Sequence, residues 1–170
     1  MTIREMKQSD YPAVRRIHQQ GIDGGKATFR RKTADYEEFD KGHLPFCRYV
    51  AEEEGNILGW ITLCPTRGMY AYHGAVEISI YVDYGAQGKG IGTALMEKVI
   101  EEAPKHGVWT LESWIFAINR ESLALHRKMG FRTVGTRERI GQGADGEWLD
   151  VVIMELRLPD ELVADFDSLI

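Results

Sequence analysis

The sequence predicts a single α/β domain in which helices flank a central sheet. Segments with strand-like and helix-like patterns alternate along the chain with short breaks, and 170 residues suit one domain. A third observation is the β-rich run from Ser79 to Val82, which passes through a glycine-rich loop directly into a long amphipathic pattern. We therefore expect a strand, a loop and a helix N-terminus to lie side by side.

The N-terminal third is expected to hold one strand and two helices. Residues 2–6 read as a strand, and Ser9 is predicted to cap a helix that the glycines between 21 and 25 break. Thr33 is predicted to cap a short helix that ends at Phe39. Two strands follow at 48–53 and 57–63.

The hairpin signal Gly55-Asn56 joins these two strands, and residues 75–82 form the predicted central strand. After the glycine loop, Ile91, Leu95, Val99 and Ala103 recur every fourth residue, which predicts a helix with one face on the sheet.

The C-terminal third continues the alternation. A strand is expected at 109–116, a helix at 119–129 that Gly130 ends, and strands at 131–137 and 148–156. We assign residues 1–158 to the domain and 159–170 to an appended tail.

Composition excludes several classes of function. The net charge of −5, without a basic cluster, argues against a nucleic-acid partner. Cys47 and Cys64 lack metal-ligand spacing, so no metal is expected. The N-terminus has no signal-like segment and no apolar run is long enough to span a membrane, so we expect a cytoplasmic protein with no membrane partner.

The glycine loop predicts a phosphate-binding site, because small residues let the backbone approach a ligand and first-turn amides attract anions. A Walker loop needs Ser or Thr after Gly88-Lys89, where this chain has Gly90. A dinucleotide loop needs its third glycine three residues after the second, but Gly92 follows Gly90 by two, and Glu112 lies inside a strand. Coenzyme A remains.

Two segments resemble the GNAT superfamily of N-acetyltransferases. Residues 87–92, Gln-Gly-Lys-Gly-Ile-Gly, resemble its pyrophosphate-binding signature, and residues 119–131 resemble its second recurring element, a helix that begins at Asn and ends in Gly-Phe. Residues 76–82, 28–30 and 148–151, with His126, resemble the phosphinothricin N-acetyltransferase type.

The resemblance implies a mixed, mostly antiparallel sheet with the acyl-CoA N-acyltransferase fold, and a homodimer. It also implies acetyl-CoA as cosubstrate, with these contacts: Tyr81, Val82, Asp83, Gln87, Gly88, Lys89, Gly90, Ile91, Gly92, Thr93, Asn119 and Ser122. A backbone amide near Val82 is expected to polarise the thioester carbonyl, because strands of this superfamily splay apart there.

Amide formation from a thioester needs a base for the amine and a proton for the thiolate. Glu77 alternates with the apolar Val76 and Ile78, so it faces away from them, and the resemblance implies that this carboxylate is the base. A solvated position or a structural ion pair is the alternative.

His126 lies two helical turns after Asn119, so both can face the cofactor, and an imidazole can protonate a thiolate. A packing role is the alternative for His126. Phe29, Arg30, Arg67 and Tyr72 are expected to bind the acceptor, as a carboxylate clamp and an aromatic wall, or else to be ordinary loop residues.

We therefore predict an acetyl-CoA-dependent N-acetyltransferase that acts by direct transfer, in a ternary complex, on the α-amino group of a small amino-acid-like substrate. The alternatives are a protein or peptide N-acetyltransferase and a non-catalytic acyl-CoA-binding module.

Overall fold

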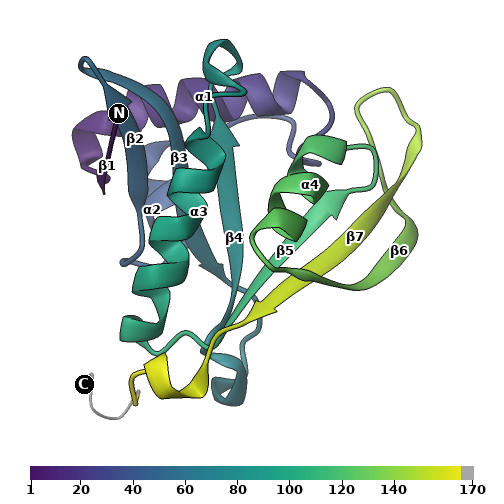
Figure 1. Ribbon diagram of the computed structural model, residues 1–170. Helices are drawn as coiled ribbons and strands as arrows, with labels where there is room; N and C mark the ends of the chain where they lie inside the picture. The colour runs from purple at the N-terminus through teal and green to yellow at the C-terminus, as the bar shows by residue number, and fades with distance from the viewer. Residues whose placement is uncertain (166–170) are drawn as a thin grey trace.

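The computed structural model describes residues 1–165, which form a seven-stranded sheet in the order β1-β2-β3-β4-β5-β7-β6 (Figure 1). All neighbouring strands are antiparallel except β4 and β5, which are parallel. The predicted mixed, mostly antiparallel sheet is thereby confirmed. The strands are β1 Thr2–Glu5, β2 Tyr49–Glu53, β3 Asn56–Pro65, β4 Ala75–Val82, β5 Thr110–Phe116, β6 Arg132–Gln142 and β7 Trp148–Arg157.

Four α-helices cover the two faces of the sheet, and short 3-10 turns join the elements (Figure 1). The α-helices are α1 Tyr11–Asp23, α2 Tyr36–Gly42, α3 Ile91–Glu102 and α4 Arg120–Lys128. The 3-10 turns are η1 Gln8–Asp10, η2 Tyr70–Tyr72, η3 Tyr84–Ala86, η4 Ala103–His106 and η5 Asp160–Leu162. No helix within residues 1–165 combines the length and apolar character needed to cross a membrane.

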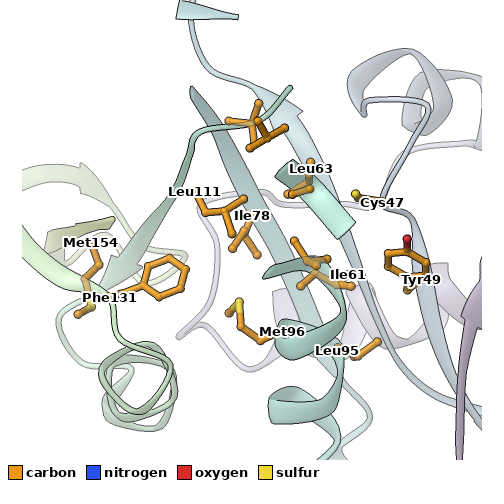
Figure 2. Packing of buried hydrophobic residues seen from close by; sticks show 14 of the residues in the cluster. Cys47, Tyr49, Ile61, Leu63, Ile78, Leu95, Met96, Leu111, Phe131 and Met154 are labelled. Atoms are coloured by element: carbon orange, nitrogen blue, oxygen red, sulfur yellow. The ribbon is translucent and has the colours of Figure 1, made fainter. Parts of the chain in front are cut away.

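Alternation along the strands divides the core between the two faces. Ile61 of β3 belongs to a large cluster with Leu95 and Met96 of α3, and these side chains point toward one another in Figure 2. Its neighbour Trp60 belongs to a second cluster, with α1 and α2. Because successive strand residues face opposite ways, α3 and α4 cover one face and α1 and α2 the other.

Strands β4 and β5 pair only over their first three residues, from Ala75↔Thr110 to Glu77↔Glu112. Beyond that pair they diverge (Figure 1). A parallel pair inside an otherwise continuous sheet therefore opens into a V, and this opening positions the candidate site.

The first two helices differ in their boundaries from the sequence-based prediction. Helix α1 continues through Gly21 to Asp23. A Cβ at Gly21 would lie 2.6 Å from the ring of Tyr81, so this glycine makes room for that ring and does not break the helix. Ser9 lies in η1 and caps nothing. Helix α2 begins after Asp35, whose carboxylate accepts the Glu38 N–H at 2.9 Å, so the predicted cap at Thr33 was two residues early.

The other elements follow the prediction within a few residues. The hairpin turn is centred on Glu54 and Gly55, which both have positive φ, one position before the predicted pair. The predicted stripe of α3, which continues into Ala103, is buried on the large cluster. Past β7, η5 and the Ala164 N–H, which donates to the Pro104 carbonyl, belong to the predicted tail; residues 166–170 lie outside the described part of the chain.

Candidate functional site

The V between β4 and β5 continues into a cleft of about 600 Å³. Its walls come from both faces of the sheet: the segment after α1, strands β4 and β5, and helix α4. Of the residues predicted from the sequence, seven line it: Phe29, Arg30, Glu77, Tyr81, Asn119, Ser122 and His126.

Glu77 is the last residue of β4 that pairs with β5, and its partner there is Glu112. Its neighbours Val76 and Ile78 are buried in the large cluster, so the Glu77 carboxylate faces the other way, into the cleft. Burial raises the pKa of Glu77, and the like charge of Glu112 raises it further. The carboxylate is therefore a better proton acceptor than an exposed glutamate.

The divergence also exposes backbone groups of β4. The Asp83 N–H donates to the Leu58 carbonyl of β3 at 2.8 Å, and neighbouring residues of an antiparallel strand direct their backbone groups to opposite sides. The N–H groups of Val82 and Ile80 consequently point toward β5, which no longer pairs with β4 at that level. Amide donors thus face the opening, as the splay expected near Val82 requires.

The glycine loop fits a pyrophosphate. Gly88 and Gly90 both have φ of +77°, and a Cβ built on either would meet nothing within 4 Å. Gly90 is the N-cap of α3 and no side chain caps the helix, so first-turn amides remain available to an anion. Gly92 lies close to α4, since its Cβ would be 3.1 Å from Leu125. Amides, open backbone and a helix N-terminus converge there.

Two predicted cofactor contacts have structural partners as well. Asp83 forms an ion pair with Arg16, and its carboxylate accepts the Gly85 N–H at 2.8 Å, which begins η3. The ring of Tyr81 stacks on Trp60, with centroids 5.0 Å apart. Burial raises the pKa of Tyr81 to about 12, so its phenol stays protonated.

His126 is buried, with 1% of its surface exposed. Its Nδ1 lies 2.7 Å from the Ser122 carbonyl oxygen and its Nε2 lies 2.7 Å from the Ser113 hydroxyl. Burial lowers the pKa of the imidazole, although the bond to the Ser122 carbonyl opposes this. His126 is thus a neutral ring with both nitrogens engaged.

Asn119 is the N-cap of α4 and fixes where this helix begins. Its side-chain oxygen accepts the Ser122 N–H at 3.2 Å. The predicted helix from Asn119 is therefore present, with Asn119 as its cap, and both residues line the cleft.

The structure does not bring Arg67 and Tyr72 into the cleft. The Arg67 guanidinium donates to the Glu112 carboxylate at 2.8 Å and lies over the ring of Tyr72, 5.4 Å from its centroid. Their position in the chain suggested acceptor binding, but this ion pair holds Arg67 outside the lining. The remaining predicted cofactor contacts also stand outside the lining: Val82 ends β4, Asp83 follows it, and residues Gln87 to Thr93, which include Lys89 and Ile91, come after η3.

Several residues of the cleft were not predicted from the sequence. His18 and His43 lie on its α1–α2 side, where burial lowers the pKa of His18 to about 4 and also lowers that of His43. Ser113 of β5 joins them as the partner of His126. Only Ser113 had a signal in the sequence, as a hydroxyl among the apolar residues of a buried strand.

No group of three or more His, Cys, Asp or Glu side chains suited to a metal ion occurs in the part of the chain described. The cleft is lined by two carboxylates, Glu38 and Glu77, the Arg30 guanidinium, imidazoles and hydroxyls, and backbone amides of β4 face its opening.

Comparisons with known proteins agree with this architecture. The model of the acetyltransferase (GNAT) family matches residues 3–131. YwnH of Bacillus subtilis is 35% identical over 166 residues, covering 91% of this chain and 97% of its own. The phosphinothricin N-acetyltransferase of Alcaligenes faecalis is 30% identical, covering 91% and 81% of the two chains. The L-methionine sulfoximine/L-methionine sulfone acetyltransferase of Salmonella typhimurium is 29% identical, covering 97% and 99%.

Solved structures show the same fold. An N-acetyltransferase from Staphylococcus aureus superposes with a TM-score of 0.85 at 34% identity, covering 93% of this chain and 98% of that one. A GNAT phosphinothricin acetyltransferase from Sinorhizobium meliloti, solved in complex with acetyl-CoA, superposes with a TM-score of 0.84 at 28% identity, covering 94% and 89%.

Proposed function

This chain belongs to the acetyltransferase (GNAT) family, and we propose that it transfers the acetyl group of acetyl-CoA to the α-amino group of a small amino-acid-like substrate. The observation that carries the proposal is the position of Glu77. A partly buried carboxylate with a raised pKa faces the cleft where β4 and β5 begin to diverge.

Acetyl-CoA supplies an activated thioester, and the glycine loop binds the pyrophosphate of this cosubstrate. The open backbone at Gly88 and Gly90 and the first-turn amides of α3, from Ile91 to Thr93, suit the pyrophosphate. Gln87 and Lys89 belong to this loop, and Asn119 and Ser122, at the start of α4, line the cleft and are proposed to contact the cofactor as well.

Glu77 acts as the general base. An amine with a pKa of about 10 is mostly protonated at neutral pH and must lose a proton before it attacks. The raised pKa of Glu77 makes the difference between the pKa values of the carboxyl group and the amine smaller. Because Glu77 lines the cleft, its carboxylate can reach the ammonium directly or through water.

The acetyl carbonyl is polarised from β4. The N–H groups of Val82 and Ile80 point into the V, so either can donate to a developing oxyanion without side-chain help. We propose that the amine attacks the thioester carbonyl directly in a ternary complex. These N–H donors and Glu77 all belong to β4.

His126 remains our predicted proton donor to the departing thiolate, and its hydrogen bonds set the condition. Because the Nδ1 proton is donated to the Ser122 carbonyl, the donor is the imidazolium form of the ring, whose second proton is on Nε2, and Nε2 lies against the Ser113 hydroxyl. The route from the ring to the leaving group therefore passes Ser113.

Phe29 and Arg30 form the acceptor side of the cleft. The ring of Phe29 packs on Phe116 with centroids 4.5 Å apart, which makes an aromatic wall. Arg30 lies 3.3 Å from Glu38 in an exposed ion pair, which is weak enough to exchange for a substrate carboxylate. We also keep Arg67 and Tyr72 as predicted acceptor contacts, in which case Arg67 must first leave Glu112.

A protein acceptor is the second candidate, because a structure named ribosomal-protein-alanine N-acetyltransferase, from Brucella melitensis, matches at 32% identity and a TM-score of 0.85. A non-catalytic acyl-CoA-binding module is the third. We favour the small amine because the segment with Phe29 and Arg30 closes one side of the cleft.

We also propose a homodimer in the cytoplasm, with residues 1–158 as the catalytic domain. Exposed apolar side chains on β6 and β7, including Val134, Ile140 and Trp148, offer a surface that a second copy can bury. Cys47 and Cys64 are both free thiols, which suits a reducing compartment.

The test is thiol release from acetyl-CoA with four kinds of acceptor: methionine sulfoximine, phosphinothricin, polyamines and a peptide. We expect turnover with the amino-acid-like compounds. Turnover with the peptide alone would favour the second candidate, and tight binding of acetyl-CoA without turnover of any amine would overturn the enzymatic proposal.

A further inference from the structure

Ser113 and His126 are arranged as a nucleophile beside a base. The Ser113 Oγ lies 2.7 Å from His126 Nε2, and the other ring nitrogen lies 2.7 Å from the Ser122 carbonyl oxygen. A hydroxyl, an imidazole and a third group that orients the imidazole are the three parts of an activated serine. Both side chains line the cleft, although Ser113 is only 3% exposed.

The hydrogen bonds fix the direction of proton transfer. A carbonyl oxygen only accepts, so the proton of the ring is on Nδ1, where it is donated to Ser122. In a neutral imidazole Nε2 then carries the lone pair and accepts the Ser113 O–H. The buried ring, with Phe131 packed edge-on at 5.0 Å, is held in this orientation. His126 is therefore placed to take the Ser113 proton.

Ser113 also lies at the point in the fold where an acyl group is expected. It is the first residue of β5 beyond the last β4–β5 pair, Glu77↔Glu112. The Val82 and Ile80 N–H groups point into the same opening from β4. The Ser113 hydroxyl, its base His126 and the Ile80 N–H thus border the cleft, while Val82 lies just beyond its lining.

We propose that Ser113 is a second acyl acceptor, which takes the acetyl group from acetyl-CoA when no amine occupies the cleft. This inference rests on the proposed binding of acetyl-CoA. The Ser113 Oγ forms a bond to the carbonyl carbon while its proton passes to His126 Nε2. The C–S bond breaks, and the proton on Nε2 passes to the sulfur. The products are free coenzyme A and an acetyl ester on Ser113, which water then hydrolyses to acetate.

The experiment incubates the purified full-length chain with acetyl-CoA and no amine, and follows coenzyme A release and the intact mass. We expect one acetyl group per chain, located by peptide mapping to Ser113, and slow continuing release of coenzyme A. A second arm uses p-nitrophenyl acetate, a small ester that needs no coenzyme A site, and is expected to label the same residue.

Matched variants separate the dyad from other hydroxyls. Ser113→Ala should abolish the label, while Ser79→Ala, which removes another hydroxyl of the cleft, should retain it. Ser113→Cys should remain acylated, now as a thioester that neutral hydroxylamine cleaves. His126→Gln should slow labelling about a hundredfold or more, since general-base catalysis contributes about that much. If His126→Gln does not fold, the result with Ser113→Ala decides the test.

The outcomes distinguish this inference from the proposed function. Amine-dependent turnover without any acetyl-Ser113 in either arm would overturn the dyad alone, as would a label that persists in Ser113→Ala. Labelling by p-nitrophenyl acetate at Ser113 without binding of acetyl-CoA would support the nucleophile and overturn the cosubstrate. Failure of both arms and of amine turnover would overturn both.

Discussion

Glu77 and Glu112 stand directly opposite each other on β4 and β5, as the last pair before the two strands diverge. Two carboxylates at one level disfavour each other's ionised form. Arg67 forms an ion pair with Glu112 at 2.8 Å, while burial raises the pKa of Glu77 and the like charge of Glu112 raises it further. Glu77 therefore lies where the two strands begin to diverge and also has the raised pKa that a general base needs.

Replacing Glu77 with Gln should lower kcat at neutral pH by about a hundredfold or more, because a neutral amide cannot accept the ammonium proton. The loss should be greatest below neutral pH but above the raised pKa of Glu77, where the wild-type carboxylate is ionised and little free amine exists. The KM for acetyl-CoA should stay nearly constant, since the loop lies apart from this residue. Steady-state rates across pH test this, and an unchanged rate would remove Glu77 from the mechanism.

Replacing Glu112 with Gln should shift the acidic limb of the kcat/KM profile to lower pH. Removing a like charge stabilises ionised Glu77, so its pKa falls, although the larger contribution from burial stays. Wild-type activity falls as pH decreases through the raised pKa of Glu77, and the variant should keep activity further into acid. Glu101→Gln, on the exposed face of α3, is the control; a profile shifted to higher pH in Glu112→Gln would contradict the pairing.

Replacing Gly90 with Ala should raise the KM for acetyl-CoA with little change in kcat. The φ of +77° costs an L-residue about 1–2 kcal/mol, and the new methyl group would occupy space that the ligand needs. Gly55→Ala is the matched control, because its φ is +80° and its Cβ also meets nothing within 4 Å. Both variants should lose similar thermal stability, and an equal rise in KM in both would refute the pyrophosphate site.

Replacing Arg30 with Met should raise the KM for amino acids and leave the KM for the matching decarboxylated amines unchanged. Only acceptors with a carboxylate lose a charge-assisted hydrogen bond. Arg15→Met, which removes an exposed guanidinium of α1 outside the cleft lining, serves as the control. Equal effects on both kinds of acceptor would show that Arg30 shapes the cleft and does not bind the carboxylate.

Asp10 tests stability apart from catalysis. Two nitrogens of Arg4 donate to its carboxylate at 2.8 and 2.9 Å, and this pairing lowers the pKa of Asp10. Its contribution is fully present above the ordinary pKa near 3.8 and is lost as pH falls through the lower folded value. Asp10→Asn should therefore cost about 1–3 kcal/mol of unfolding free energy at pH 7 and less in acid, with KM unchanged. Denaturant titrations at pH 7 and pH 3 check both; equal costs would contradict the pKa assignment.

The local elements were predictable because they depend on neighbours in the chain. The apolar period of α3, the alternation in β4 and the spacing of Gly88, Gly90 and Gly92 are properties of short windows. The α2 cap was misplaced because Thr33 and Asp35 are both good caps, and only the course of the chain decides between them. Gly21 was taken as a helix break because its packing partner, Tyr81, is sixty residues away.

The sequence alone determined the α/β class, the glycine loop before α3 and the direction in which Glu77 faces, since periodicity and spacing encode all three. Which groups come into contact depends on the folded chain. It paired Arg67 with Glu112 outside the cleft, placed Ser113 against His126, and ended the β4–β5 ladder at Glu77. Each of these depends on contacts between segments distant in the chain, whose energies no local pattern contains.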